Sequence, residues 1–315
     1  MMDTDTRKLP RGLWPVMLTP FSETNQVDHD QLRALTDFYL DHGARGLFAN
    51  CLSSEMFQLT DEERLSVVAT VARRAGSRAP VVASGTFSSD LPRCSEFIRR
   101  VHDAGAAAVV LITNQLARAD QHDDHLKRSS EQIMKATGSI PLGVYECPVP
   151  YKRLLSPELM RWLGSSGRFF YHKDTSCDIA AIRPKVEAVR GTPLALYNAN
   201  TATALASLEA GAAGISPIGA NFYPELYTYL ITEFDKNGVT PRLARLNAQL
   251  DVMDTIVDRH YPHSAKWFLK ARGLNISTAS RLPSAAMTVE DRMKLDSLVK
   301  TFNQATETYL AGEKV

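Results

Sequence analysis

The sequence predicts an α/β protein, a (β/α)8 TIM barrel followed by a C-terminal helical extension. Eight short apolar segments recur along the chain, and amphipathic helical patterns fill most of the intervals between them. Each segment is continuously apolar rather than alternating, which is typical of parallel strands covered on both faces. Eight strands separated by helices fit a closed barrel better than an open sheet. The predicted strands cover residues 13–18, 46–50, 80–84, 107–113, 141–146, 168–173, 193–198 and 214–218.

The helices expected between the early strands have recognisable starts and stops. Residues 28–42 space their apolar side chains three or four positions apart, as one face of a helix requires. Residues 61–75 follow Thr60, a suitable N-cap, and Glu63 completes a capping box with it. Residues 91–104 repeat the pattern. No glycine-rich loop opens a helix after the first strand, so a dinucleotide-binding fold loses its main support.

Beyond about residue 235 the pattern changes to helices alone. They are expected at residues 242–257, 263–273 and 289–310. We therefore predict a barrel over residues 1–235 and a helical extension over residues 236–315, packed against the barrel. No linker rich in Pro, Gly or Ser separates the two parts.

Composition narrows the classes of partner and location. A formal net charge of +1 over 315 residues gives no electrostatic reason to expect nucleic acid or an acidic membrane as partner. The polar start, MMDTDTRKLPRG, lacks the apolar core of a signal peptide, and no apolar stretch approaches the roughly 20 residues that span a bilayer. Four widely separated cysteines form no CxxC pair, which indicates neither a disulfide framework nor a zinc site. A cytoplasmic protein is expected.

The active site of such a barrel forms at the carboxyl ends of its strands. The side chains expected there are Ser53, Ser54, Glu55, Tyr145, Lys173, Asn198, Ile215 and Ser216. Tyr145 and Lys173 end consecutive strands, so neighbouring positions are expected. A lysine in an apolar pocket has a lowered pKa, and its neutral amine can attack a carbonyl carbon. A tyrosine beside it can move protons while a carbinolamine forms and breaks down. The pair suits Schiff-base chemistry on a 2-oxo acid.

The order and spacing of several segments resemble the dihydrodipicolinate synthase / N-acetylneuraminate lyase family of class I aldolases. The resemblance runs from about Gly12 to the final helices. The segments that carry it are GLWPVMLTPF with VDHDQL, HGARGLFANCLSSEMFQLTDEER, VYECP, YHKDTS and GAAGISPIGANFYP. It implies a lyase in which Lys173 forms the Schiff base and Tyr145 transfers protons. It also implies a homo-oligomer, a dimer or a tetramer, and no cofactor beyond the covalent imine at Lys173.

The substrate-binding residues expected from the resemblance and the strand ends are Ser53, Ser54, Asn198 and Ile215. In the motif that the family writes Gly-Thr-Thr-Gly-Glu, this chain reads Cys-Leu-Ser-Ser-Glu. Ser53 keeps one carboxylate-binding hydroxyl, and Leu52 has lost the other. The backbone N–H groups of Ser53 and Ser54 are expected to compensate.

Three further departures from the family pattern concern substrate choice. Leu116 stands where the synthases place a second catalytic tyrosine, and Pro150 stands where they place an arginine. Thr201 and Ala202 replace the acidic pair of the sialic acid lyases. The departures argue against both well-known activities and imply pyruvate, or a related 2-oxo acid, with a different partner.

Two alternatives remain open at this point. The same lysine would serve a dehydratase acting on a 2-keto-3-deoxy sugar acid, or a deaminase acting on a hydroxyproline-derived imine. A protein of another class, one that binds a 2-oxo acid without turning it over, is suggested by the loss of polar groups at Leu52 and Leu116.

Other polar residues near these segments have simpler explanations. Glu55 is expected to be a structural carboxylate, and Glu146 and Cys147 receive no assigned role. The segment from His122 to His125 resembles a metal cluster, but it opens a predicted helix, where acidic residues favourably oppose the helix dipole. No metal is expected.

Overall fold

The computed structural model describes residues 8–257, 260–283 and 287–311. Its eight strands form one parallel sheet in which sequence neighbours lie side by side. The strands are β1 (Gly12–Leu13), β2 (Leu47–Ala49), β3 (Val81–Ser84), β4 (Ala108–Ile112), β5 (Leu142–Tyr145), β6 (Phe169–Asp174), β7 (Ala195–Asn198) and β8 (Gly214–Ile215). β1 pairs with β8, and a parallel bridge between Val16 and Phe48 joins the segment after β1 to β2. The predicted barrel is confirmed.

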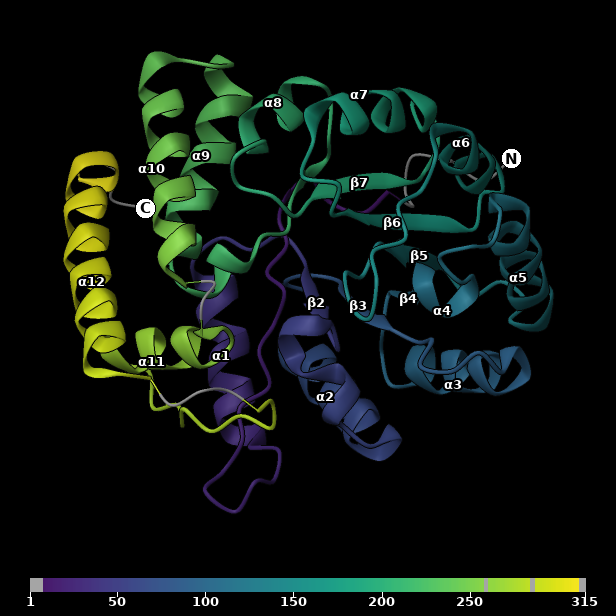
Figure 1. The fold of residues 1–315 in the computed structure, drawn as a ribbon, viewed down its shortest axis with the longest axis horizontal. Helices are drawn as coiled ribbons and strands as arrows, with labels where there is room; N and C mark the ends of the chain where they lie inside the picture. Colours follow the sequence, from purple (N-terminus) through teal and green to yellow (C-terminus); the bar gives the residue numbers. More distant parts are fainter. Residues whose placement is uncertain (1–7, 258–259, 284–286, 312–315) are drawn as a thin grey trace.

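Helices follow the strands and cover the outside of the barrel (Figure 1). They are α1 (His29–Asp41), α2 (Asp61–Ala75), α3 (Leu91–Asp103), α4 (Thr113–Leu116), α5 (Asp123–Ala136), α6 (Pro157–Ser165), α7 (Ile179–Ala188), α8 (Ala204–Glu209) and α9 (Pro224–Asn237). Short 3-10 turns follow β2, at Leu52–Ser54 and Met56–Gln58, and β8, at Ile218–Asn221. The predicted capping box is present, since Thr60 accepts from the Glu63 N–H and Glu63 accepts from the Thr60 N–H.

The C-terminal extension contains α10 (Pro241–Val257), α11 (His263–Ala271) and α12 (Val289–Leu310), as the sequence predicted. Figure 1 shows these helices gathered on one side of the barrel, with α12 outermost. The predicted boundary at residue 235 falls in the last turn of α9, and the division into two parts stays a prediction. No helix in the described ranges is long and apolar enough to cross a membrane.

Aromatic side chains fill the interior of the barrel. Trp14, Phe48, Tyr145, Tyr171 and Tyr197 are buried in one cluster, separate from the larger core between strands and helices. The Tyr171 and Tyr197 rings stack with their centroids 4.9 Å apart, and Trp14 packs against both. The interior is therefore a packed, water-poor support beneath the strand ends.

A register shift between β5 and β6 sets which side chains of β6 face inward. Leu142 pairs with Phe169, but the next residue, Gly143, pairs with Tyr171. A Cβ atom on Gly143 would lie 2.9 Å from the Tyr171 carbonyl oxygen, so the close approach requires glycine. After the shift, strand alternation turns Tyr171 and Lys173 into the barrel.

Candidate active site

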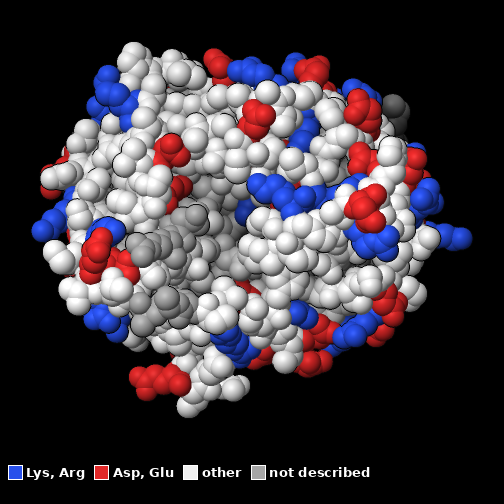
Figure 2. All heavy atoms as spheres, in the orientation of Figure 1, with Lys and Arg blue, Asp and Glu red and all other residues white. Residues whose placement is uncertain are grey.

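Lys173 and Tyr145 meet at the carboxyl ends of β6 and β5. They are direct partners in the parallel register, and the Lys173 Nζ lies 4.8 Å from the centroid of the Tyr145 ring. The Phe48 ring centroid is 6.0 Å from the same nitrogen. In Figure 1, β6 and β7 run toward the middle of the molecule, and Figure 2 shows a hollow there with Lys or Arg atoms at its edge. The sequence prediction that the two residues are neighbours is confirmed.

Burial shifts the pKa of both groups. It lowers the pKa of the Lys173 ammonium, because the charged form loses its hydration and only cysteine thiols of Cys51, Cys147 and Cys177 oppose the shift. It raises the pKa of the Tyr145 hydroxyl well above the usual value of 10.0. The site therefore offers an amine that is readily neutral beside a hydroxyl that keeps its proton.

The loop after β2 carries Ser53 and Ser54. The Ser54 hydroxyl donates to the Met17 carbonyl at 2.6 Å and accepts from the Cys51 N–H, and the Ser54 N–H donates to the Cys51 carbonyl. These bonds hold the loop and occupy both the hydroxyl and the N–H of Ser54. The expected contact of Ser54 with substrate stays a prediction. The buried Ser53 hydroxyl lies beside the hydroxyl of Tyr261, which comes from the C-terminal extension.

Glu55 ends the same loop in the left-handed region, with φ at 57°. Its buried carboxylate accepts from the Lys266 ammonium at 2.8 Å, the Ser280 hydroxyl at 2.8 Å and the Arg281 N–H at 2.6 Å. Both oxygens are thus bonded to the C-terminal extension. This agrees with the structural role expected for Glu55.

Asn198 and Ile215 lie at the ends of β7 and β8, as predicted. The Asn198 amide donates to the Asn200 carbonyl and to the hydroxyls of Thr203 and Ser207, which shapes the loop before α8. Ile215 is 1% exposed and packs in the core between strands and helices. The substrate contacts expected of Asn198 and Ile215 remain predictions.

A buried ionic cluster behind the strand ends was missed by the sequence analysis. The Lys185 ammonium, on α7, lies 2.6 Å from Glu146 Oε1 and 2.7 Å from Asp174 Oδ2. His172 adds an imidazole with its Nε2 3.5 Å from Glu146 Oε1. The available signal was weak: two acidic residues at the ends of buried strands, and a lysine inside a largely apolar helix.

Charges within this cluster outweigh the effect of burial. Burial by itself would raise the pKa of the Glu146 carboxyl, but His172 and Lys185 lower that pKa from 4.5 to about 2. Burial also opposes the charge on Lys185, yet Glu146 and Asp174 raise the pKa of its ammonium above 10.5. Both partners of the ion pair are therefore charged at neutral pH.

The cluster also has the ligand types of a metal site. Within the described residues, Glu146, His172 and Asp174 are the only group that brings three such ligand atoms within 4.8 Å of one another. The Lys185 ammonium lies within hydrogen-bonding distance of both carboxylates, Glu146 and Asp174. This positive charge argues against a metal ion between the three residues. His122, by contrast, caps α5 with its side chain 84% exposed.

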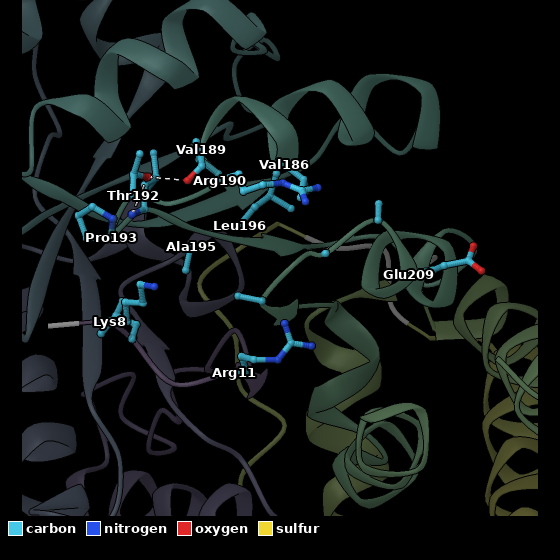
Figure 3. A pocket seen from close by; sticks show the side chains of 15 residues that line it. Lys8, Arg11, Val186, Val189, Arg190, Thr192, Pro193, Ala195, Leu196 and Glu209 are labelled. Carbon is cyan, nitrogen blue, oxygen red and sulfur yellow. Dashed lines mark hydrogen bonds between the residues drawn. The ribbon is translucent and has the colours of Figure 1, made fainter. Parts of the chain in front are cut away.

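A separate cavity opens at the amino-terminal end of β7 (Figure 3). Lys8 and Arg11 line it from the chain before β1, and Arg190 and Thr192 line it from the segment after α7. None of the predicted site residues belongs to its lining. It lies at the opposite end of the strands from Lys173.

The protein is a lyase of the class I aldolase type, as its match to a family of such enzymes shows. The family model described as the dihydrodipicolinate synthetase family matches residues 9–302. The chain belongs to this family, as the sequence resemblance indicated.

Individual relatives are distant but cover nearly the whole chain. A 4-hydroxy-tetrahydrodipicolinate synthase of Bacillus subtilis (strain 168) is 26% identical over 287 residues, which are 90% of this chain and 96% of the relative. One from Methanothrix thermoacetophila is 25% identical and covers 94% of this chain and 98% of its own.

Solved structures show the same fold. YagE, a prophage protein of the dihydrodipicolinic acid synthase family from E. coli K12, was solved in complex with pyruvate. It superposes with a TM-score of 0.84 at 22% identity and covers 93% of this chain and 98% of its own. The dihydrodipicolinate synthase from Acinetobacter baumannii, also complexed with pyruvate, gives a TM-score of 0.83 at 24% identity over 93% of this chain and 99% of its own.

Proposed function

We propose that this protein is a lyase that forms a Schiff base between Lys173 and pyruvate or a related 2-oxo acid. The observation that carries the proposal is the pairing of a buried lysine, whose pKa is lowered, with a protonated tyrosine at the carboxyl end of the barrel. Two solved relatives were complexed with pyruvate, which supports the choice of ligand. The proposal requires no cofactor besides the lysine.

Each step of imine formation has a group to perform it. The lone pair of the neutral Lys173 amine forms a bond to the substrate C2 while the C2–O π bond breaks. Tyr145 gives its proton to the oxygen and takes one back from the nitrogen, which leaves a neutral carbinolamine. Tyr145 then gives its proton to the hydroxyl, which leaves as water as the nitrogen lone pair forms the protonated imine, and a solvent proton restores Tyr145. The protonated imine at C2 then accepts the electron pair that is released at C3 when a bond to C3 breaks. Ser53 is our candidate to bind the carboxylate.

The departures at Leu116, Pro150 and Thr201 guide our proposal for the partner substrate. Leu116 is 3% exposed and apolar, Pro150 is exposed without a charge, and Thr201 bonds to Asp254. None of the three can replace a tyrosine, an arginine or an acid at those positions. We therefore propose that the enzyme is neither a dihydrodipicolinate synthase nor a sialic acid lyase.

Other proposals from the resemblance remain beside this one. Dehydration of a 2-keto-3-deoxy sugar acid, or deamination of a hydroxyproline-derived imine, would use the same lysine. The alternative of another class, a protein that binds a 2-oxo acid without turnover, disagrees with the lyase family to which the chain belongs. A homo-oligomer, dimer or tetramer, and a cytoplasmic location stay predictions.

The first prediction tests the nucleophile. Incubation with pyruvate and borohydride should add the mass of the reduced adduct to the peptide that contains Lys173, because hydride reduces the imine to a stable amine. Lys173→Met, which keeps the aliphatic chain, should lose the adduct while the thermal unfolding curve shows a folded protein. Peptide mass spectrometry measures the outcome. An adduct that persists in Lys173→Met would overturn the assignment.

The second prediction concerns the synthase reaction. Condensation of pyruvate with aspartate semialdehyde should be absent or very slow in a protein that still forms the pyruvate adduct. The positions of Leu116 and Pro150 supply no polar group for the second substrate. Efficient formation of the cyclic product, followed by its absorbance, would show that other residues replace them. A screen of sugar-derived 2-oxo acids with the same preparation would then identify the substrate class.

A further inference from the structure

The two reacting residues are followed in sequence by two carboxylates that point the other way. Tyr145 and Lys173 are register partners, and Glu146 and Asp174 come directly after them. Strand alternation sends Tyr145 and Lys173 into the barrel and sends Glu146 and Asp174 toward α7. One ammonium, that of Lys185, bridges both carboxylates at 2.6 and 2.7 Å. A single side chain thus connects the two positions next to the reacting pair.

The two carboxylates are also bonded to the chain around the site. Glu146 Oε2 accepts from the Thr175 N–H at 2.9 Å, and Glu146 Oε1 accepts from the Leu155 N–H at 2.8 Å. Asp174 Oδ1 accepts from the N–H and the hydroxyl of Ser176. The cluster therefore joins the end of β5, the end of β6, the loop before α6 and the helix α7.

The last backbone hydrogen bond between the two strand ends is long. It runs from the Glu146 N–H to the Lys173 carbonyl at 3.3 Å, just beyond the usual range of about 2.7–3.2 Å. β5 ends at Tyr145, so Glu146 lies just past the regular pairing, and its carbonyl accepts from the Thr175 hydroxyl at 2.6 Å. The bridge through Lys185 provides the additional restraint. A buried ion pair is seldom the most stabilising choice, since apolar side chains of similar volume often do as well.

We propose that Lys185 is a positioning residue of the active site, which holds Tyr145 and Lys173 in register for proton transfer by bridging Glu146 and Asp174. The inference rests on the proposed Schiff-base function. Lys185 itself lies outside the barrel interior, with its side chain 3% exposed, and contacts no reacting atom. Its removal should slow the reaction at Lys173 and leave the binding of pyruvate nearly unchanged, because Ser53 lies on a different loop.

The test compares three variants at the cluster. Lys185→Met removes the bridge but leaves two buried carboxylates unpaired, so it risks failing to fold. The triple variant Lys185→Met, Glu146→Gln, Asp174→Asn removes the bridge and the charges together and keeps the volumes. Lys185→Arg keeps the charge and should rescue most of the function. Arg168→Met is the matched control, since Arg168 bonds the Ile140 and Met134 carbonyls at the opposite end of β6.

The measurement is the rate of pyruvate adduct formation per folded protein, at rising pyruvate concentrations. We expect the saturating rate to fall about 10- to 100-fold in the triple variant, with the half-saturating concentration little changed, as for a misplaced reacting group. Arg168→Met should lose thermal stability but keep the wild-type rate. A wild-type rate in the triple variant, or an equal loss in Arg168→Met, would overturn the inference and mark the cluster as structural.

Three outcomes separate this inference from the proposed function. Failure of the triple variant to fold would show that the cluster serves folding, and would overturn the positioning role. Absence of the adduct in the wild-type protein would overturn the proposed function, and this inference with it. An adduct in the wild type with unchanged rates in the variants would overturn this inference alone.

Discussion

Two buried lysines a dozen residues apart show how environment decides the chemistry of one residue type. Lys173 faces aromatic rings, and no described ion pair includes it, so burial lowers the pKa of its ammonium. Lys185 faces two carboxylates, those of Glu146 and Asp174, outside the barrel interior, and they raise the pKa of its ammonium. The first amine is prepared to react, and the second is held as a permanent cation.

The third prediction concerns Tyr145. Tyr145→Phe keeps the ring that packs beside Lys173 and Phe48 and removes only the hydroxyl. General acid–base help of this kind contributes about 10²–10⁴-fold, so turnover should fall by roughly that factor. Slow trapping of the imine at Lys173 should survive, because the amine is untouched. Steady-state kinetics and borohydride trapping measure the two effects.

A matched control for Tyr145→Phe is Tyr197→Phe. Tyr197 also lies in the barrel interior, but its hydroxyl donates to the Pro10 carbonyl at the amino-terminal side. Its loss should affect stability and leave proton transfer unchanged. Wild-type turnover in Tyr145→Phe would mean that water or another group moves the proton, and the role of Tyr145 would have to be withdrawn.

Residues of the site differ in how well sequence alone reveals them. Lys173 and Tyr145 could be found because each ends an apolar strand, and consecutive parallel strands bring such ends together. Lys185 could not, since nothing local shows which helical residue reaches across to Glu146 and Asp174. The occupied hydroxyl of Ser54 was also invisible, because its partner lies 37 residues away.

At the scale of elements, local signals predicted the helices better than the strand limits. The capping box at Thr60 and the apolar spacing of residues 28–42 depend only on neighbours in sequence, and both were confirmed. The first strand was predicted over residues 13–18, but regular pairing ends at Leu13, and later residues contribute only a bridge. The register shift opposite Gly143 depends on a neighbouring strand, so sequence periodicity could not reveal it.

The C-terminal extension completes the loop that carries Ser53. Lys266 and residues 280–282 bond both oxygens of Glu55, at the end of that loop. Tyr261 contacts Ser53 and accepts from the Asn221 amide at 2.6 Å. The partners of Glu55 lie more than two hundred positions away in sequence. The extension therefore holds the loop at the active site in place, although it lies outside the barrel.

For the whole molecule, the contact between extension and barrel contains a carboxyl group with an unusual pKa. Asp254, on α10, is bonded by the hydroxyls of Thr201, Tyr223 and Tyr227. Burial outweighs these hydrogen bonds and raises the pKa of Asp254 from 3.8 to about 6. The folded protein therefore holds this proton more tightly than the unfolded chain does.

The last prediction follows from the sign of this shift. A raised folded pKa contributes stability that is fully present below about pH 3.8 and is lost as pH rises through about 6. Asp254→Asn, which stays neutral at every pH, removes this dependence. Between about pH 4.5 and about pH 7, the wild-type unfolding free energy should fall by about 2 kcal/mol relative to that of Asp254→Asn.

Urea denaturation at several pH values measures the difference. Asp103→Asn, an equal change at an exposed site on α3, should follow the wild-type curve. Parallel curves for the wild type and Asp254→Asn would show that Asp254 titrates alike in the folded and unfolded chains, and that the carboxyl plays no part in coupling the extension's docking to pH.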